Sequence, residues 1–234
     1  MQRRILISGA GVVSAIGLDK AQTLESLRAG RTGVDKVSYL ETDRTEFPVG
    51  EVKLTNGQMK QMLGIAQDKV VTRTSLMGIM ALKEALEQAG LGREELADAA
   101  LVGGTTVGGM DSSEKYYRDF INPDTAEHSE YISAHDCGTT TDAMADYFGA
   151  FKLTTTLSTA CSSAANAVIL GARLILSGQA EIVAVGGSEC LSSFHVNGFN
   201  TLMILDREQC RPFDATRAGL NLGEGAGFLI LETE

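Results

Sequence analysis

Hydrophobic and polar residues are arranged along the chain in blocks that predict strands and helices in alternation. Short runs rich in Val, Ile, Thr and Leu are typical of buried strands, and longer segments with apolar residues at helical spacing are typical of amphipathic helices. The expected strands are residues 4–8, 99–104, 153–159, 181–187 and 225–231, and the expected helices are residues 19–29, 74–89, 112–120, 129–148 and 164–176. This order predicts an α/β fold: a largely parallel or mixed sheet of about five strands, with helices on both faces.

Glycines mark the expected ends of these elements. Gly30 and Gly90 follow two of the predicted helices, where a left-handed residue commonly stops the helix. Residues 31–58 carry turn residues and little periodicity, so we expect a surface excursion there. No segment has the composition of a linker, and residues 1–234 are therefore interpreted as a single domain.

The first strand is followed by Gly9-Ala10-Gly11, which we expect to form a turn. Backbone amides at such a turn can hold a phosphate, so dinucleotide binding has to be considered. The next glycine is Gly17, which is too far from Gly11 for the dinucleotide motif, and no acidic residue closes a second strand about 20 residues later. This pattern argues against a nucleotide site.

Cys161 lies where the threonine-rich strand changes into the helix of residues 164–176. A cysteine in an arbitrary intracellular protein is most often a small buried hydrophobe. Here, however, the thiol precedes the unpaired amides of a helix start, which should lower its pKa and raise the thiolate fraction. Because the helix is apolar on nearly every face, we expect it to be central and buried, with Cys161 shielded from water.

Composition narrows the possible partners of the chain. Its 234 residues are 44% hydrophobic and its net charge is −10 at neutral pH, which argues against nucleic acid as the main partner. Local positive patches are still conceivable, although scattered solvated charges are the commoner arrangement. The two candidate patches are Lys60, Lys69 and Arg73, and separately Arg207, Arg211 and Arg217.

The four cysteines are widely separated and the chain has only three histidines, so no metal site is predicted. No apolar run approaches the length of a membrane span, and the first residues lack a secretory cleavage pattern. We therefore expect a cytoplasmic protein that does not bind membranes.

Several separated motifs together resemble the β-ketoacyl synthases of the thiolase-like superfamily. The motif around the cysteine, Thr159-Ala160-Cys161-Ser162-Ser163-Ala164, is similar to the nucleophile motif of that family. The other matching segments, in the family's order and spacing, are Ile7 to Gly17, Val185-Gly186-Gly187-Ser188-Glu189, Arg211-Pro212-Phe213-Asp214 and Gly223-Glu224-Gly225-Ala226-Gly227. The resemblance extends over essentially the whole chain and implies the amino-terminal, thiolase-like half of such an enzyme.

The resemblance implies a decarboxylating Claisen condensation, in which Cys161 accepts an acyl group that a malonyl thioester then attacks. Substrates would be carried on phosphopantetheine, with no other cofactor. By position, Val107 and Phe199 would line the acyl pocket, with simple core packing as the alternative. Lys69 and Arg207 would dock an acidic acyl carrier protein. The strand before the cysteine would form a homodimer contact, or the chain would pair with a complementary half.

The second half of the family supplies two histidines, a lysine and a second oxyanion amide, and these have no counterpart before Glu234. His195 is a candidate base, but a lone histidine is usually structural. Two hypotheses therefore stay open. The chain is either part of a condensing enzyme, truncated or completed by another polypeptide, or a non-catalytic half that binds acyl chains or serves as a scaffold. The retained Cys161 favours the enzyme, while acyl chain length and pathway are not decided.

Overall fold

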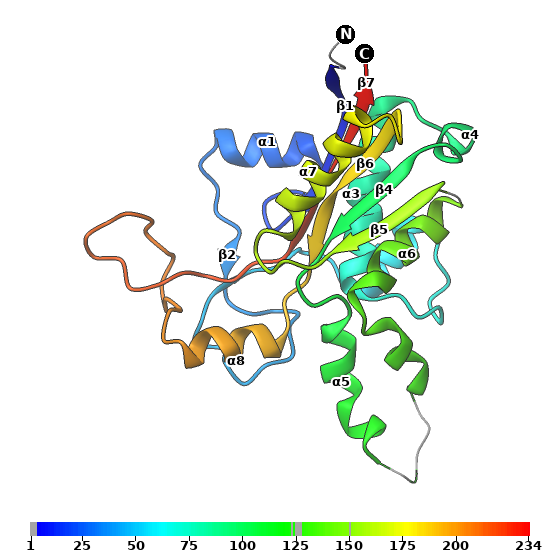
Figure 1. Cartoon of the computed structure of the whole chain (residues 1–234). Helices are drawn as coiled ribbons and strands as arrows, with labels where there is room; N and C mark the ends of the chain where they lie inside the picture. Colours follow the sequence, from blue (N-terminus) through cyan, green and yellow to red (C-terminus); the bar gives the residue numbers. More distant parts are fainter. Residues whose placement is uncertain (1–3, 123, 125–127, 150) are drawn as a thin grey trace.

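A computed structural model describes residues 4–122, 124, 128–149 and 151–234. Its centre is a five-stranded sheet in the order β1-β7-β6-β4-β5 (Figure 1). β7 runs antiparallel to both β1 and β6, whereas β6, β4 and β5 are mutually parallel. The strands are β1 (Ile5–Ser14), β4 (Ala100–Gly104), β5 (Leu153–Leu157), β6 (Ile182–Glu189) and β7 (Gly225–Thr233). The prediction of a mixed five-stranded sheet is confirmed.

Helices cover both faces of this sheet, as the pattern predicted (Figure 1). α3 and α6 pack on one face, and α7 packs across β6, β4 and β5 on the other. The helices are α1 (Lys20–Arg28), α2 (Asn56–Leu63), α3 (Arg73–Ala89), α4 (Arg93–Leu96), α5 (Met110–Phe120), α6 (Cys137–Phe148), α7 (Ser163–Leu176) and α8 (Ser193–Thr201), with a 3₁₀ turn η1 (Ser129–Ala134). None of the helices in the described residues is long and apolar enough to cross a membrane.

The predicted helix of residues 74–89 corresponds to α3, which forms the centre of the larger core. Thr72 caps its start by accepting a hydrogen bond from the Ser75 N–H, and Gly90 ends it in the left-handed conformation with φ of 70°. Leu76, Met77 and Leu82 are completely buried between this helix and the sheet. Helix capping and apolar spacing, both visible in the sequence, therefore place α3 correctly.

The expected turn at Gly9-Ala10-Gly11 is wrong, because both glycines lie inside the ten-residue strand β1. An added Cβ at Gly9 would stand 2.1 Å from the carbonyl oxygen of Ala85, and one at Gly11 would stand 1.9 Å from that of Ala81. The glycines therefore let α3 approach the strand backbone closely, which is a common reason for glycine in a strand interior.

Residues 31–58 are more than the expected surface excursion. They contain the short hairpin of β2 (Val34–Asp35) and β3 (Val49–Gly50) and the start of α2. Val49 and Val52 are buried, and the carboxylate of the buried Glu51 accepts hydrogen bonds from three successive backbone amides, those of Ser38, Tyr39 and Leu40. The hydrophobic periodicity of the sequence did not predict the structure of this segment, because that structure depends on contacts with distant parts of the chain.

Two helix predictions also need correction. The region 129–148 is divided between η1 and α6, which begins at Cys137. α7 follows the cysteine as predicted, but only one of its faces is buried against the sheet. On its outer face Ile169 is 47% exposed and Leu176 is 52% exposed. No other part of the described chain covers this face. The prediction, from the apolar composition of the helix, that α7 is buried on all sides is therefore wrong.

Candidate active site

Cys161 lies in a tight turn between the end of β5 at Leu157 and the start of α7 at Ser163. Ala160, the residue before the cysteine, has a φ of 53° in the left-handed region, where residues with a Cβ are strained. The hydroxyl of Ser163 holds this conformation, because it accepts from the Thr159 N–H at 2.9 Å and donates to the Ala160 carbonyl at 2.7 Å. The turn therefore presents the thiol ahead of the first helical residue.

The thiol lines a hollow of about 240 Å³ at the carboxyl ends of β4 and β6 and the start of β7. Its walls include Thr105, Thr106, Gly187, Glu189 and Gly227. Cys161 is exposed at this hollow, so the expectation that it is shielded from water is wrong for this chain.

The Thr105-Thr106 turn joins the strand ends to the cysteine turn. The Thr105 N–H donates to the Leu157 carbonyl at 3.1 Å, and the Thr106 carbonyl accepts from the Ser158 hydroxyl at 3.1 Å. On its other side, the carboxylate of Glu189 accepts from the Thr106 N–H and, at 3.2 Å, from the Thr105 hydroxyl. Three neighbouring strand ends are thus tied together around the thiol.

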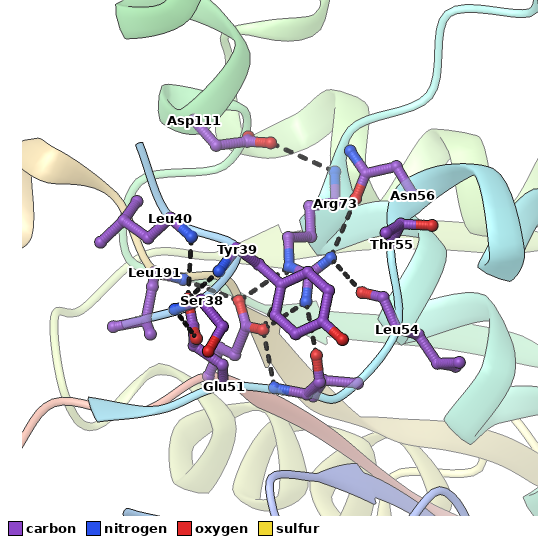
Figure 2. Close-up of polar contacts among 12 residues, drawn as sticks. Ser38, Tyr39, Leu40, Glu51, Leu54, Thr55, Asn56, Arg73, Asp111 and Leu191 are labelled. Atoms are coloured by element: carbon purple, nitrogen blue, oxygen red, sulfur yellow. Dashed lines mark hydrogen bonds and ion pairs between the residues drawn. The ribbon is translucent and has the colours of Figure 1, made fainter. Parts of the chain in front are cut away.

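A buried ion pair between Arg73 and Glu224 fixes the start of β7 beside this hollow. Figure 2 shows the Arg73 side chain among Tyr39, Leu54 and Asn56. The Nε of Arg73 donates to the Glu224 carboxylate at 2.9 Å. The two other guanidinium nitrogens donate to the backbone carbonyls of Val52 and Leu54 and to the side-chain oxygen of Asn56. The Tyr39 ring lies near the guanidinium, with 5.9 Å between the guanidinium carbon and the ring centroid. Because Glu224 immediately precedes Gly225, the pair positions the glycine-rich wall of the hollow.

A second cavity, of about 550 Å³, lies beside this ion pair and is lined by Tyr39, Asp111, Glu114 and Lys115 among others. It is larger than the hollow at Cys161 but contains no thiol. Glu114 accepts hydrogen bonds from the Ser193 and Phe194 amides and so holds the first turn of α8. Glu114, in the wall of this cavity, therefore has structural partners.

The other cysteines differ from Cys161 in their surroundings. Cys190 is completely buried, and burial together with the charge of Asp111 raises the pKa of its thiol well above the usual value. Cys137 is half-buried and its thiol donates to the Thr106 carbonyl at a sulfur–oxygen distance of 3.7 Å. Among the described residues, no cluster of His, Cys, Asp and Glu is suited to hold a metal ion. Cys161 is the one of the four cysteines that is exposed.

The remaining predicted site residues lie outside the hollow. Val107, which directly follows Thr106, and Phe199 on α8 are both half-buried, and their contact with an acyl chain stays a prediction. Lys69 is exposed in the loop between α2 and α3. Arg207 is also exposed, with its guanidinium carbon 5.8 Å from the centroid of the Phe47 ring. Their role in docking likewise stays a prediction.

The first predicted positive patch does not form. Arg73 is buried against Glu224, and Lys60 is buried with its ammonium donating to the carbonyls of Gln67 and Lys69. Burial lowers the pKa of Lys60. In the second set, Arg211 is paired with Glu208 at 3.0 Å. Lys69 is therefore left as the exposed member of the first set.

His195 does not line the hollow at Cys161. It lies in the first turn of α8, where its Nδ1 is 2.9 Å from the Ser192 hydroxyl. Burial lowers the pKa of His195, and the charge of Glu189 offsets part of that effect. This environment agrees with the structural role that a lone histidine usually has.

Sequence reasoning missed the roles of Glu189, Thr105 and Thr106. Glu189 lies in the segment Val185-Gly186-Gly187-Ser188-Glu189, which resembles a family motif, but the resemblance implies no function for its carboxylate. A usable signal was present, because β4 and β6 are predicted strands that each end in polar residues. If two such strands are parallel neighbours, their carboxyl ends meet at one edge of the sheet, where ligands bind in many α/β proteins.

Comparison with known proteins agrees with this geometry. Residues 2–234 match the family described as "Beta-ketoacyl synthase, N-terminal domain". The chain is 30% identical over its whole length to nodulation protein E of Rhizobium meliloti (strain 1021), and 27% identical over 99% of its length to 3-oxoacyl-[acyl-carrier-protein] synthase 2 of Staphylococcus aureus (strain COL). It spans 58% of the length of each of these relatives.

Among solved structures, the ishigamide ketosynthase/chain length factor superposes on the whole chain with a TM-score of 0.90 at 26% sequence identity. The chain covers 59% of that protein. This likeness confirms the predicted ketosynthase-type, thiolase-like architecture, and the family match confirms the resemblance inferred from the motifs. The chain therefore belongs to the β-ketoacyl synthase family, whose N-terminal domain it matches over residues 2–234.

Proposed function

We propose that this chain is the nucleophile-bearing half of a 3-oxoacyl-[acyl-carrier-protein] synthase and that Cys161 accepts the acyl group. The observation that carries the proposal is the exposed thiol on a strained turn before α7, facing a hollow at the strand ends. A thiolate in this position is a competent nucleophile for a thioester, and the helix start favours its negative charge. Membership of the β-ketoacyl synthase family supports the same reaction.

In the first step, the Cys161 thiolate attacks the carbonyl carbon of an acyl thioester on the phosphopantetheine arm of a carrier protein. A carbon–sulfur bond forms to Cys161, the bond to the carrier sulfur breaks, and the carrier thiolate leaves. The backbone N–H of Cys161 is one donor to the oxyanion of the tetrahedral intermediate. Val107 and Phe199 are the proposed walls for the acyl chain.

In the second step, a malonyl thioester loses carbon dioxide, and the electron pair of the broken carbon–carbon bond attacks the acyl carbon. The bond from that carbon to Cys161 breaks, which releases a 3-oxoacyl thioester and regenerates the thiolate. In the proposed enzyme the groups that assist decarboxylation belong to a second half. The partial coverage of the relatives and the uncovered apolar face of α7 support such a half, whether in the same polypeptide or in a separate one.

The carrier protein is proposed to dock at Lys69 and Arg207, since acidic carriers need positive charge on a body whose net charge is −10. Exposed charge pairs are screened by salt, so carrier affinity should fall as ionic strength rises. Reversal of both charges with Lys69→Glu and Arg207→Glu should weaken binding further, as measured by titration of a fluorescent carrier. Binding that ignores both salt and charge reversal contradicts this docking site.

The acylation proposal is tested by the intact mass of the chain after incubation with an acyl thioester. The wild-type chain should gain one acyl mass, and Cys161→Ala should gain none. Cys210→Ala is the matched control, because Cys210 is a half-buried thiol outside the hollow, and this variant should be acylated like the wild type. Equal adducts on wild type and Cys161→Ala contradict the proposal. No adduct on either, with Cys161 still alkylated by iodoacetamide, favours a scaffold half.

A further inference from the structure

Glu189 is an acidic side chain in the wall of the hollow that contains Cys161, and the proposed reaction gives it no role. It is the last residue of β6 and is half-buried. Within the described residues it belongs to no ion pair and makes no hydrogen bond to Cys161. Its carboxylate instead accepts two hydrogen bonds from the end of β4, one from the Thr106 N–H and one from the Thr105 hydroxyl.

The two residues that Glu189 holds contact the cysteine turn on both sides. The carbonyl of Thr106 accepts from the hydroxyl of Ser158, three residues before Cys161. The hydroxyl of Ser163, two residues after Cys161, shares its one proton between the Ala160 carbonyl at 2.7 Å and the Thr105 carbonyl at 3.3 Å. The same Ser163 hydroxyl closes the turn around Ala160. Glu189 is therefore two hydrogen bonds away from both flanks of the thiol.

The turn needs such support because Ala160 has a left-handed backbone, a conformation that persists only when surrounding contacts impose it. Charge gives a second reason to assign a role. An unpaired carboxylate beside a thiol disfavours the thiolate, so a site for a nucleophilic cysteine gains nothing from a free acid here. The Thr105 and Thr106 donors stabilise the Glu189 carboxylate without removing its charge, so its function as an acceptor explains its presence better than its charge does.

We propose that Glu189 is a positioning residue for Cys161: it fixes the Thr105-Thr106 turn, which in turn holds the cysteine turn and aims the thiol at its thioester. This role rests on the proposed acylation of Cys161. Glu189→Ala removes both acceptors. Glu189→Gln keeps an oxygen for the Thr106 N–H and an amide that can pair with the Thr105 hydroxyl, so it should restore the contact without the charge.

The first measurement is the rate of acyl transfer from an acyl thioester to Cys161, followed by intact mass. Glu189→Ala should be slowed by about tenfold or more, because small displacements of a reacting group carry large rate penalties. Glu189→Gln should stay within about threefold of the wild type. Glu181→Ala is the matched control, since Glu181 is an exposed acid at the opposite end of β6, and it should leave the rate unchanged. Equal rates for Glu189→Ala and the wild type overturn the proposal.

The second measurement is the pH dependence of Cys161 alkylation by iodoacetamide, which requires the thiolate but little orientation. Both variants remove the same charge, so the midpoints of Glu189→Ala and Glu189→Gln should agree with each other, and a slower acylation of Glu189→Ala alone is then an effect of position. A purely electrostatic role predicts instead that both variants change the acylation rate equally and that both midpoints move. That pair of results overturns the proposal.

Hydrogen–deuterium exchange tests the inference independently of acyl transfer. In Glu189→Ala, amides in residues 105–109 and 157–163 should exchange faster than in the wild type, whereas Glu181→Ala should leave them unchanged. Unchanged exchange over residues 157–163 overturns the role of Glu189, even if Cys161 is acylated normally. A wild-type chain that takes no acyl group contradicts the proposed function, while faster exchange in Glu189→Ala still supports the link to the cysteine turn.

Discussion

At the residue scale, the buried Glu224 and the half-buried Asp111, both near Arg73, differ in how well their charge is compensated. Glu224 accepts hydrogen bonds from the Arg73 guanidinium and from the backbone N–H groups of Val52 and Leu191. Asp111 accepts one from the Arg73 backbone N–H at 3.3 Å. Burial raises the pKa of Asp111, and hydrogen bonds from the Arg73 and Ser112 amides and the Cys190 thiol offset only part of this effect.

This raised pKa predicts a pH dependence of stability. The pKa of a free aspartate is about 3.9. Above that pH the folded chain holds the Asp111 proton more tightly than the unfolded chain, so the contribution of Asp111 to stability falls as pH rises toward the folded pKa. Asp111→Asn removes the charge and keeps an acceptor for the Arg73 N–H. It should raise the free energy of unfolding at pH 7, because the charge that burial disfavours is then absent.

Urea unfolding at several pH values measures this difference. The gain from Asp111→Asn should shrink as pH falls toward 4, where the wild-type carboxyl is protonated in the folded and increasingly in the unfolded chain. Asp43→Asn is the control, because Asp43 is exposed in a loop and should change stability little at any pH. A gain that is constant from pH 7 to pH 4 contradicts the assignment of the effect to the Asp111 charge.

At the scale of elements, the contact between β1 and α3 depends on two positions without side chains. Gly11→Ala places a Cβ against the carbonyl of Ala81 and should destabilise the fold by about 1–3 kcal/mol, since rigid backbone has to move. Gly227→Ala is the matched control. Gly227 lies in the neighbouring strand β7, where it pairs with Val12 of β1, and an added Cβ at Gly227 meets no atom within 4 Å. Its effect should be within about 0.5 kcal/mol. Thermal unfolding distinguishes the two, and equal melting temperatures contradict the close-approach role of Gly11.

Elements were predictable from the sequence where their signals are local. The limits of α3 follow from Thr72 and Gly90, and the change from strand to helix at Cys161 follows from residue types on either side. The course of β1 through Gly9 and Gly11 was not predictable, because a glycine that opens a turn and one that admits a helix look alike in sequence. The contacts of Glu189 were not predictable either, because they depend on β6 and β4 being neighbours in the sheet, which the local sequence does not reveal.

At the scale of the whole molecule, the sheet is covered unequally. One face is buried under α3 and α6, whereas α7 on the other face presents apolar side chains outward. Further exposed apolar residues lie in and after α8, including Phe194, Leu202 and Met203, and Phe213 is 99% exposed. Large exposed apolar areas mark interaction surfaces, and Ala164 at the start of α7 lines the hollow with Cys161. The proposed second half would cover the thiol and the helix together.

The chain by itself should therefore associate through the outer face of α7. Ile169→Lys with Leu176→Lys places two charges on that face without disturbing the buried side, so the melting temperature should hardly change. Self-association should weaken by at least about tenfold, because each buried apolar side chain contributes about 1.5–3 kcal/mol. Size-exclusion chromatography with light scattering over a range of concentrations measures this. Leu174→Lys is the contrasting variant, since Leu174 is 7% exposed against the sheet and its replacement should unfold the chain. A double variant that associates like the wild type, or a wild type that is monomeric throughout, contradicts α7 as the contact face.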